Sequence, residues 1–73
     1  MKRILVFRTS VESALQVKKL KPLLDGLLQE YESWNFDLED CDRILRIESA
    51  RLSPVVIVNR LEREGFKCVE LEV

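Results

Sequence analysis

The sequence contains no histidine, which removes the side chain most often used as a general base and as a ligand for transition metals. It also lacks a basic excess, because 12 lysines and arginines stand against 13 aspartates and glutamates, for a net charge of −1. A nucleic-acid-binding domain needs a basic patch, so nucleic acid is not expected as a partner. No catalytic constellation is present either, and we expect a protein that is not an enzyme.

Long apolar runs are missing as well. The apolar run at residues 4–7 ends at Arg8, far too early for the core of a signal peptide or for a membrane span. We therefore expect a cytoplasmic protein without membrane insertion. Cysteine is scarce, and in a protein without an export signal Cys41 and Cys68 are expected to be two reduced thiols.

What is present is an ordinary globular mixture of 73 residues, 47% apolar and 34% charged. A chain of this length buries only about 60% of the surface that its unfolded form exposes, so there is room for one small core. We expect a single domain over residues 1–73, without internal repeats or linkers.

Two alternating segments in the middle of the chain predict a β-hairpin. Apolar and polar side chains alternate over residues 34–38 and again over residues 43–48, and the acidic residues 39–42 join the two segments. One face of this hairpin should be buried. The side chains expected on that face are Trp34, Phe36, Leu38, Leu45 and Ile47.

A helix is expected before the hairpin, over about residues 13–30. Apolar residues recur there at spacings of three and four, and two overlapping capping signals, at residues 9–12 and 13–16, mark its start. Pro22 removes a backbone donor and Gly26 costs about 1 kcal/mol relative to alanine, but the pattern continues through both. We expect one helix with a kink at Pro22. Its inner stripe consists of Val17, Leu20, Leu24, Leu27 and Tyr31.

A second helix is expected after the hairpin. Ser53 is a capping hydroxyl, Pro54 suits the first helical position, and Gly65 suits a left-handed stop. The four apolar residues after the proline resemble a strand by themselves, but the flanking signals favour a helix. Since four consecutive residues of a helix cannot all face inward, Val55 or Val58 should be partly exposed. The inner stripe consists of Ile57 and Leu61.

Strand-forming segments at residues 2–8 and 66–73 complete the pattern. The order strand, helix, strand, strand, helix, strand predicts an α+β fold of the ferredoxin-like βαββαβ type. We expect a four-stranded antiparallel sheet in the order 4-1-3-2 with two helices on one face. In this order the loop at residues 9–14, the hairpin turn at residues 39–42 and Gly65 lie at the same end of the sheet, where a site would form.

These patterns resemble the heavy-metal-associated (HMA) domain family, the copper-chaperone-like βαββαβ modules, over nearly the whole chain. The resemblance rests on Val17-x-x-Leu20-x-x-Leu23-Leu24-x-x-Leu27, Phe36-Asp37-Leu38 and Ile57-x-x-x-Leu61-x-x-x-Gly65-Phe66. It implies the fold given above and soft-metal binding by a Cys-x-x-Cys at the end of the first loop. Counted back from Val17, those two positions are Ser13 and Gln16 here, so the resemblance implies a degenerate metal site.

The leading hypothesis is a non-enzymatic HMA-like module that has no cofactor and acts through protein contacts. A protein partner or a second copy of the chain would bind at an edge strand, or at Val55 or Val58. The alternative is a copper or zinc protein that uses Cys41 with the flanking Asp40 and Asp42 in place of the lost pair. The competing interpretation of this segment is a solvated acidic turn.

Other candidate residues have simpler structural explanations. Cys68 is expected to be a small buried residue, and it should share no ion or disulfide with Cys41, because opposite edge strands lie about 14 Å apart. Trp34 and Phe36 could form a ligand-stacking platform on the open face of the sheet. Their alternation with polar residues favours a place in the core instead.

Overall fold

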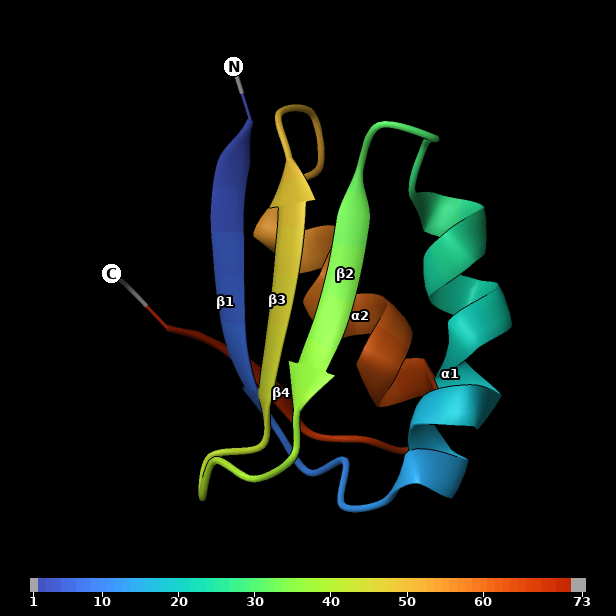
Figure 1. The fold of residues 1–73 in the computed structure, drawn as a ribbon, viewed down its shortest axis with the longest axis vertical. Coiled ribbons are helices and arrows are strands. Elements are labelled where there is room, and N and C mark those ends of the chain that lie inside the picture. The colour runs from blue at the N-terminus through green and yellow to red at the C-terminus, as the bar shows by residue number, and fades with distance from the viewer. Residues whose placement is uncertain (1, 72–73) are drawn as a thin grey trace.

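The computed structural model describes residues 2–71 and confirms the predicted α+β fold. The elements are β1 (Arg3–Thr9), α1 (Ala14–Leu27), β2 (Ser33–Asp37), β3 (Ile44–Ser49), α2 (Pro54–Arg63) and β4 (Cys68–Leu71). The four strands of the described residues form one antiparallel sheet in the order β2-β3-β1-β4, which is the predicted 4-1-3-2 viewed from the other edge (Figure 1). Positions 72 and 73 of the predicted last strand lie outside the described residues.

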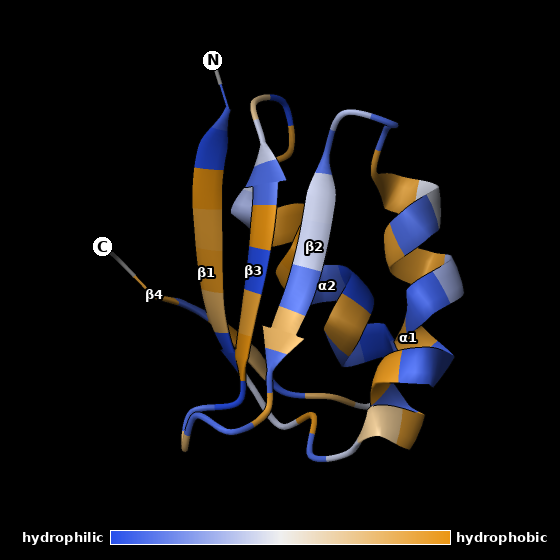
Figure 2. Ribbon diagram, in the orientation of Figure 1, coloured by the Kyte–Doolittle hydropathy of each residue, from blue (hydrophilic) through white to orange (hydrophobic). Residues whose placement is uncertain are grey.

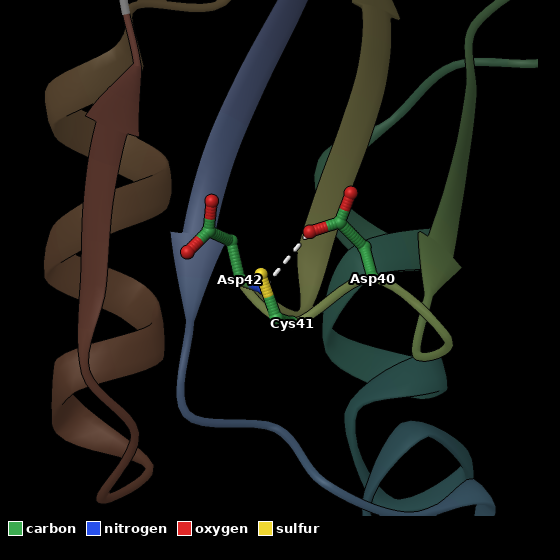
Figure 3. Close-up of side chains that lie close together, drawn as sticks. All are labelled: Asp40, Cys41 and Asp42. Atoms are coloured by element: carbon green, nitrogen blue, oxygen red, sulfur yellow. Dashed lines mark hydrogen bonds between the residues drawn. The ribbon is translucent and has the colours of Figure 1, made fainter.

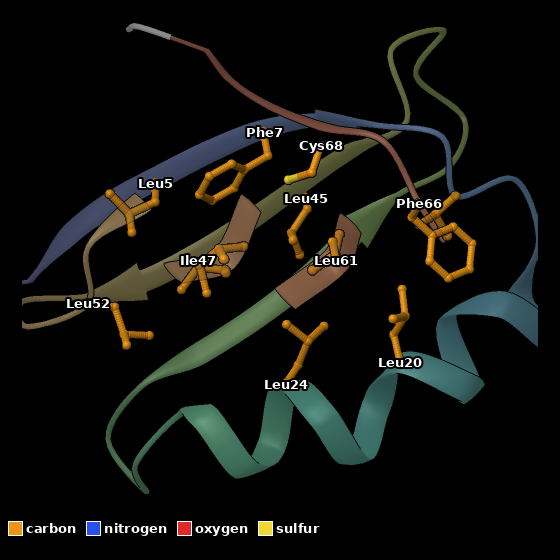
Figure 4. Close-up of a cluster of buried hydrophobic side chains, with 12 residues drawn as sticks. Leu5, Phe7, Leu20, Leu24, Leu45, Ile47, Leu52, Leu61, Phe66 and Cys68 are labelled. Atoms are coloured by element: carbon orange, nitrogen blue, oxygen red, sulfur yellow. The ribbon is translucent and has the colours of Figure 1, made fainter. Parts of the chain in front are cut away.

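One apolar core lies between the sheet and the two helices. Because side chains alternate along a strand, Leu5 and Phe7 of β1 face the helices while Ile4 and Arg8 face the other way. β1 is hydrophobic along most of its length (Figure 2), so apolar side chains stand on both of its faces. From the predicted inner stripes, Leu20 and Leu24 of α1 and Leu61 of α2 lie in this core (Figure 4). Ile57 is also buried there, and Val17 and Leu27 pack partly against it. Its fully buried members include Phe7, Leu20, Leu24, Leu45, Ile47, Ile57 and Leu61.

The second of the two capping signals starts α1. The Ser13 hydroxyl accepts a hydrogen bond from the Gln16 backbone N–H at 3.2 Å, and Gln16 Oε1 accepts from the Glu12 N–H at 2.6 Å. Thr9, from the first signal, belongs to β1 instead, and its hydroxyl donates to the Arg43 carbonyl at 2.7 Å. The helix then continues through Pro22, as its apolar pattern predicts.

The predicted end of α1 is wrong by three residues, because the helix ends at Leu27 rather than at residue 30. The Glu32 carboxylate accepts the Gln29 backbone N–H at 2.9 Å, which holds this segment in a loop. Tyr31 is consequently 58% exposed in that loop and is not part of the inner stripe.

The predicted boundaries of α2 are close, but its cap differs. Pro54 begins the helix, and Gly65 has a φ of +91°, the left-handed conformation expected of a stop. The Ser53 hydroxyl makes no capping hydrogen bond, so that prediction is wrong. The Ser53 backbone carbonyl accepts the Val56 N–H at 3.1 Å instead.

A buried polar network joins the loop before β2 to the loop after β3. The Glu32 carboxylate accepts hydrogen bonds from the Ser49 hydroxyl and, at 2.8 Å, from the Arg51 guanidinium. Ser49 Oγ in turn accepts the backbone N–H groups of Arg51 at 3.2 Å and Leu52 at 3.1 Å. The hydrogen bond from Ser49 is the main cause that lowers the pKa of the Glu32 carboxyl below 4.5.

This pKa shift predicts how the stability of the fold depends on pH. A lowered folded-state pKa means that the ionised Glu32 stabilises the fold above about pH 4.5 and that this contribution is lost as the pH falls through the folded-state pKa. In urea unfolding followed by Trp34 fluorescence, the wild type should therefore lose stability in acid more steeply than Glu32→Gln. Glu64→Gln, at an exposed carboxylate directly after α2, is the matched control and should keep the wild-type slope. Equal slopes in wild type and Glu32→Gln would contradict the assignment.

Candidate functional site

The three loops predicted to lie at one end of the sheet do meet there (Figure 1). The Thr9 backbone N–H donates to the carbonyls of Asp42 and Arg43, both at 3.2 Å, which ties the hairpin loop to the end of β1. Ser10 and Lys67 are joined by two hydrogen bonds, from the Ser10 N–H to the Lys67 carbonyl at 3.1 Å and from the Lys67 N–H to Ser10 Oγ at 2.9 Å. The end of β1 is therefore held between the hairpin loop and the start of β4.

A small hollow of about 190 Å³ opens at this end. Its lining mixes two basic side chains with one carboxylate, one thiol and two hydroxyls. The residues are Arg8, Thr9, Ser10, Cys41, Asp42, Lys67 and Val69. The Thr9 hydroxyl and Ser10 Oγ are already occupied by backbone groups.

The acidic turn brings together the residues of the alternative metal hypothesis. Three possible ligand atoms, one each from Asp40, Cys41 and Asp42, lie within 4.8 Å of one another (Figure 3). The cysteine is exposed. One thiolate and two carboxylates form a donor set that zinc accepts. The turn also has the bonds of an ordinary acidic turn, because the Asp42 N–H donates to Asp40 Oδ1 at 2.8 Å.

Arg43 closes the hairpin loop, a role that sequence reasoning missed. Its φ is +50°, which is uncommon for a residue other than glycine. Its guanidinium donates to the carbonyls of Leu38 at 3.4 Å and Asp40 at 3.3 Å, so the side chain braces the loop from inside. Arginine has no preference for positive φ, so the sequence does not predict this conformation at residue 43.

Ser13 and Gln16, which the resemblance places where two metal-binding cysteines would stand, cap α1. Both side chains accept backbone N–H groups at the start of the helix. Neither residue lines the hollow next to Cys41.

The two cysteines are free thiols in different surroundings. Cys68 is 3% exposed and belongs to the core, as predicted, whereas Cys41 is exposed on the turn. Burial, with a smaller effect of the Glu62 charge, raises the pKa of Cys68 to about 12. Cys68 is therefore unsuited to metal binding or to reaction with solutes.

Trp34 and Phe36 are half-buried and pack against the core, as their alternation predicts. Their rings meet edge to face with centroids 5.9 Å apart. The indole N–H of Trp34 also donates to Asp25 Oδ1 at 2.9 Å, which links β2 to α1. The sequence carries no signal for this contact, because the two residues belong to different elements.

The predicted contact surface on α2 is confined to the first turn of the helix. Val55 is 62% exposed and Val56 is 38% exposed, whereas Val58 packs partly against the core. The prediction that Val55 or Val58 is partly exposed is therefore confirmed for Val55.

Two further observations concern the chain as a whole. Within residues 2–71, every helix is too short or too polar to cross a bilayer. No family model, curated protein or solved structure matches the chain. What it has in common with the heavy-metal-associated domains is the βαββαβ topology of the ferredoxin-like fold.

Proposed function

We propose that this chain is a small non-enzymatic module of HMA type, without the family's metal-binding cysteine pair, that binds another protein through the open face of its sheet beside β4. The observation that carries the proposal is a partly exposed apolar stripe on this face, which we call the sheet stripe. It consists of Ile4, Val6, Val69 and Leu71.

The sheet stripe crosses the pairing between β1 and β4. Val6 is the cross-strand partner of Leu71, so these side chains lie on the same face of the sheet. Ile4 is 59% exposed and Val69 is 51% exposed, and they lie at the two ends of the stripe, with Val6 and Leu71 between them. Apolar surface of this kind favours contact with another protein.

The stripe ends at an edge of the sheet, which adds backbone groups to the apolar contact. β4 is an edge strand, and the outer N–H and C=O groups of such a strand can pair with an added strand. The other edge strand, β2, has the polar residues Asn35 and Asp37 on its open face, so it offers less apolar surface. The exposed valines of α2 stand on a single helical turn and form only a small patch. The β4 edge is therefore the better surface for a partner chain.

The capping of α1 supports the absence of a metal role at the first loop. Ser13 and Gln16 hold backbone N–H groups where the family places two thiolates. The two free thiols also fit a reducing compartment, and a cytoplasmic location is part of the proposal.

Val69→Lys tests the proposal, because a lysine in an apolar contact must lose its hydration on binding. The immobilised wild type should capture a partner from native extract, or the wild type in solution should self-associate in sedimentation. Val69→Lys should weaken this binding about tenfold or more, and tenfold corresponds to roughly 1.4 kcal/mol. Val55→Lys is the matched control, with the same change on the helix side.

Circular dichroism checks that both variants fold. Binding that survives Val69→Lys but is lost in Val55→Lys would locate the contact on α2 and contradict the proposal. Equal binding by all three proteins would contradict it as well.

A second candidate function is copper or zinc binding at the acidic turn. The convergence of the ligand atoms of Asp40, Cys41 and Asp42 within 4.8 Å favours it. A single thiolate with two carboxylates is a weaker donor set for soft metals than a cysteine pair, so we rank this candidate second.

Alkylation with iodoacetamide tests the metal candidate. Cys41 should react in the folded protein, whereas Cys68 should react only after unfolding, because burial raises its pKa to about 12. Bound zinc should slow the reaction of Cys41 severalfold in the wild type, and the protection should disappear in Asp40→Asn. An unchanged rate with zinc would eliminate this candidate.

A further inference from the structure

The hydrogen bonds between β1 and β4 determine which backbone groups of β4 point outward. The Ser10 N–H donates to the Lys67 carbonyl at 3.1 Å, so these two residues form a hydrogen-bonded pair of the antiparallel ladder. Hydrogen-bonded and non-hydrogen-bonded pairs alternate along such a ladder. Val69, the partner of Arg8, therefore also directs its N–H and C=O groups to β1.

Cys68 and Glu70 occupy the alternate, non-hydrogen-bonded positions opposite Thr9 and Phe7. Their backbone N–H and C=O groups consequently point away from β1. β4 is an edge of the sheet, and within residues 2–71 no strand pairs with this side of it. An added strand would meet the backbone groups of these two residues.

A second copy of β4, running antiparallel to the first, satisfies both residues at once. In a two-fold arrangement centred on Val69, Cys68 of each copy lies opposite Glu70 of the other copy. Each of these pairs exchanges an N–H···O bond in both directions. The outer edge of β4 is therefore complementary to itself.

The neighbouring two-fold registers are less favourable. An arrangement centred on Glu70 places the two Glu70 side chains directly opposite each other, and like charges in such positions are destabilising. An arrangement centred on Cys68 places Glu70 opposite Phe66, whose N–H already donates to the Leu61 carbonyl at 3.1 Å. Charge and hydrogen bonding thus select the register centred on Val69, and a net charge of only −1 on each chain gives little overall repulsion.

The side chains on the open face also fit this register. Val69, which is 51% exposed, would pack against Val69 of the second copy in a non-hydrogen-bonded pair, where opposing side chains are closest. Leu71 lies opposite Lys67 of the second copy, whose aliphatic stem can cover it while the ammonium stays in water. The two sheet stripes then form one continuous apolar band.

We propose that the partner of the sheet stripe is a second copy of this chain, and that β4 joins the two four-stranded sheets into one, with Val69 on the two-fold axis. This inference rests on the proposed function, because it names the partner of the same surface. β4 has four residues, whereas a standard interface uses about 20–30 residues a side. The dimer is therefore weak and should dissociate at micromolar concentrations.

Glu70→Pro separates the backbone pairing from the side chains of the sheet stripe. The Glu70 N–H points outward, so a proline there removes a donor to the second copy and no hydrogen bond within the chain's own sheet. In sedimentation equilibrium at up to several hundred micromolar, the wild type should approach twice the chain mass of 8.6 kDa. Glu70→Pro should weaken dimerisation about tenfold or more.

Glu70→Ala is the matched control, because it loses the same side chain and keeps the N–H. It should dimerise as the wild type does, and circular dichroism checks that both variants fold.

Disulfide cross-linking tests the register. Val69→Cys, in a Cys41→Ser background, places two thiols in a non-hydrogen-bonded pair with Cα atoms about 4.5 Å apart, which is within the range of a disulfide. Oxidised glutathione should convert this variant into a covalent dimer. Leu71→Cys in the same background is the control and should stay uncross-linked, because the two introduced thiols would be about 14 Å apart along the strands.

The dimer is overturned if the wild type stays monomeric, if Glu70→Pro dimerises as well as Glu70→Ala, or if the two introduced cysteines cross-link equally. The proposed function survives these results when Val69→Lys still weakens the capture of another protein from extract. Failure of the dimer is therefore distinguishable from failure of the proposed function.

Discussion

Burial of the sheet on one face only is the constraint on which the rest of this structure depends. Along β1, Leu5 and Phe7 turn into the core while Ile4 and Arg8 turn away from the helices. In residues 2–71 both helices cover the same side of the sheet, and the other side is open. The core and the partly exposed stripe beside β4 both follow from this division.

The fold was predictable because its signals are local and repeated. Alternation over the hairpin and spacings of three and four in the helices are each supported by several residues, and the order of elements then limits the topology. The end of α1 was missed because it depends on a distant contact. The Glu32 carboxylate accepts hydrogen bonds from Ser49 and Arg51, which are distant in sequence. The same carboxylate accepts the Gln29 backbone N–H, which holds residue 29 in a loop.

The candidate site was predictable only in outline. Strand order placed the hairpin turn, the first loop and Gly65 at one end, and the structure joins them through Thr9 and Ser10. The positive φ of Arg43 and the bond between Trp34 and Asp25 have no signature in residue type or spacing. Packing patterns specify a fold, whereas function depends on individual side chains that tertiary structure brings together.

Adjacent substitutions on β1 test one-sided burial most directly. Leu5 is 5% exposed and Ile4 is 59% exposed, although they are neighbours of similar size in the same strand. The free energy of unfolding, measured in urea, should fall by about 2–5 kcal/mol in Leu5→Ala and by less than about 1 kcal/mol in Ile4→Ala. Equal losses in the two variants would mean that both faces of the sheet are buried, and would contradict the account.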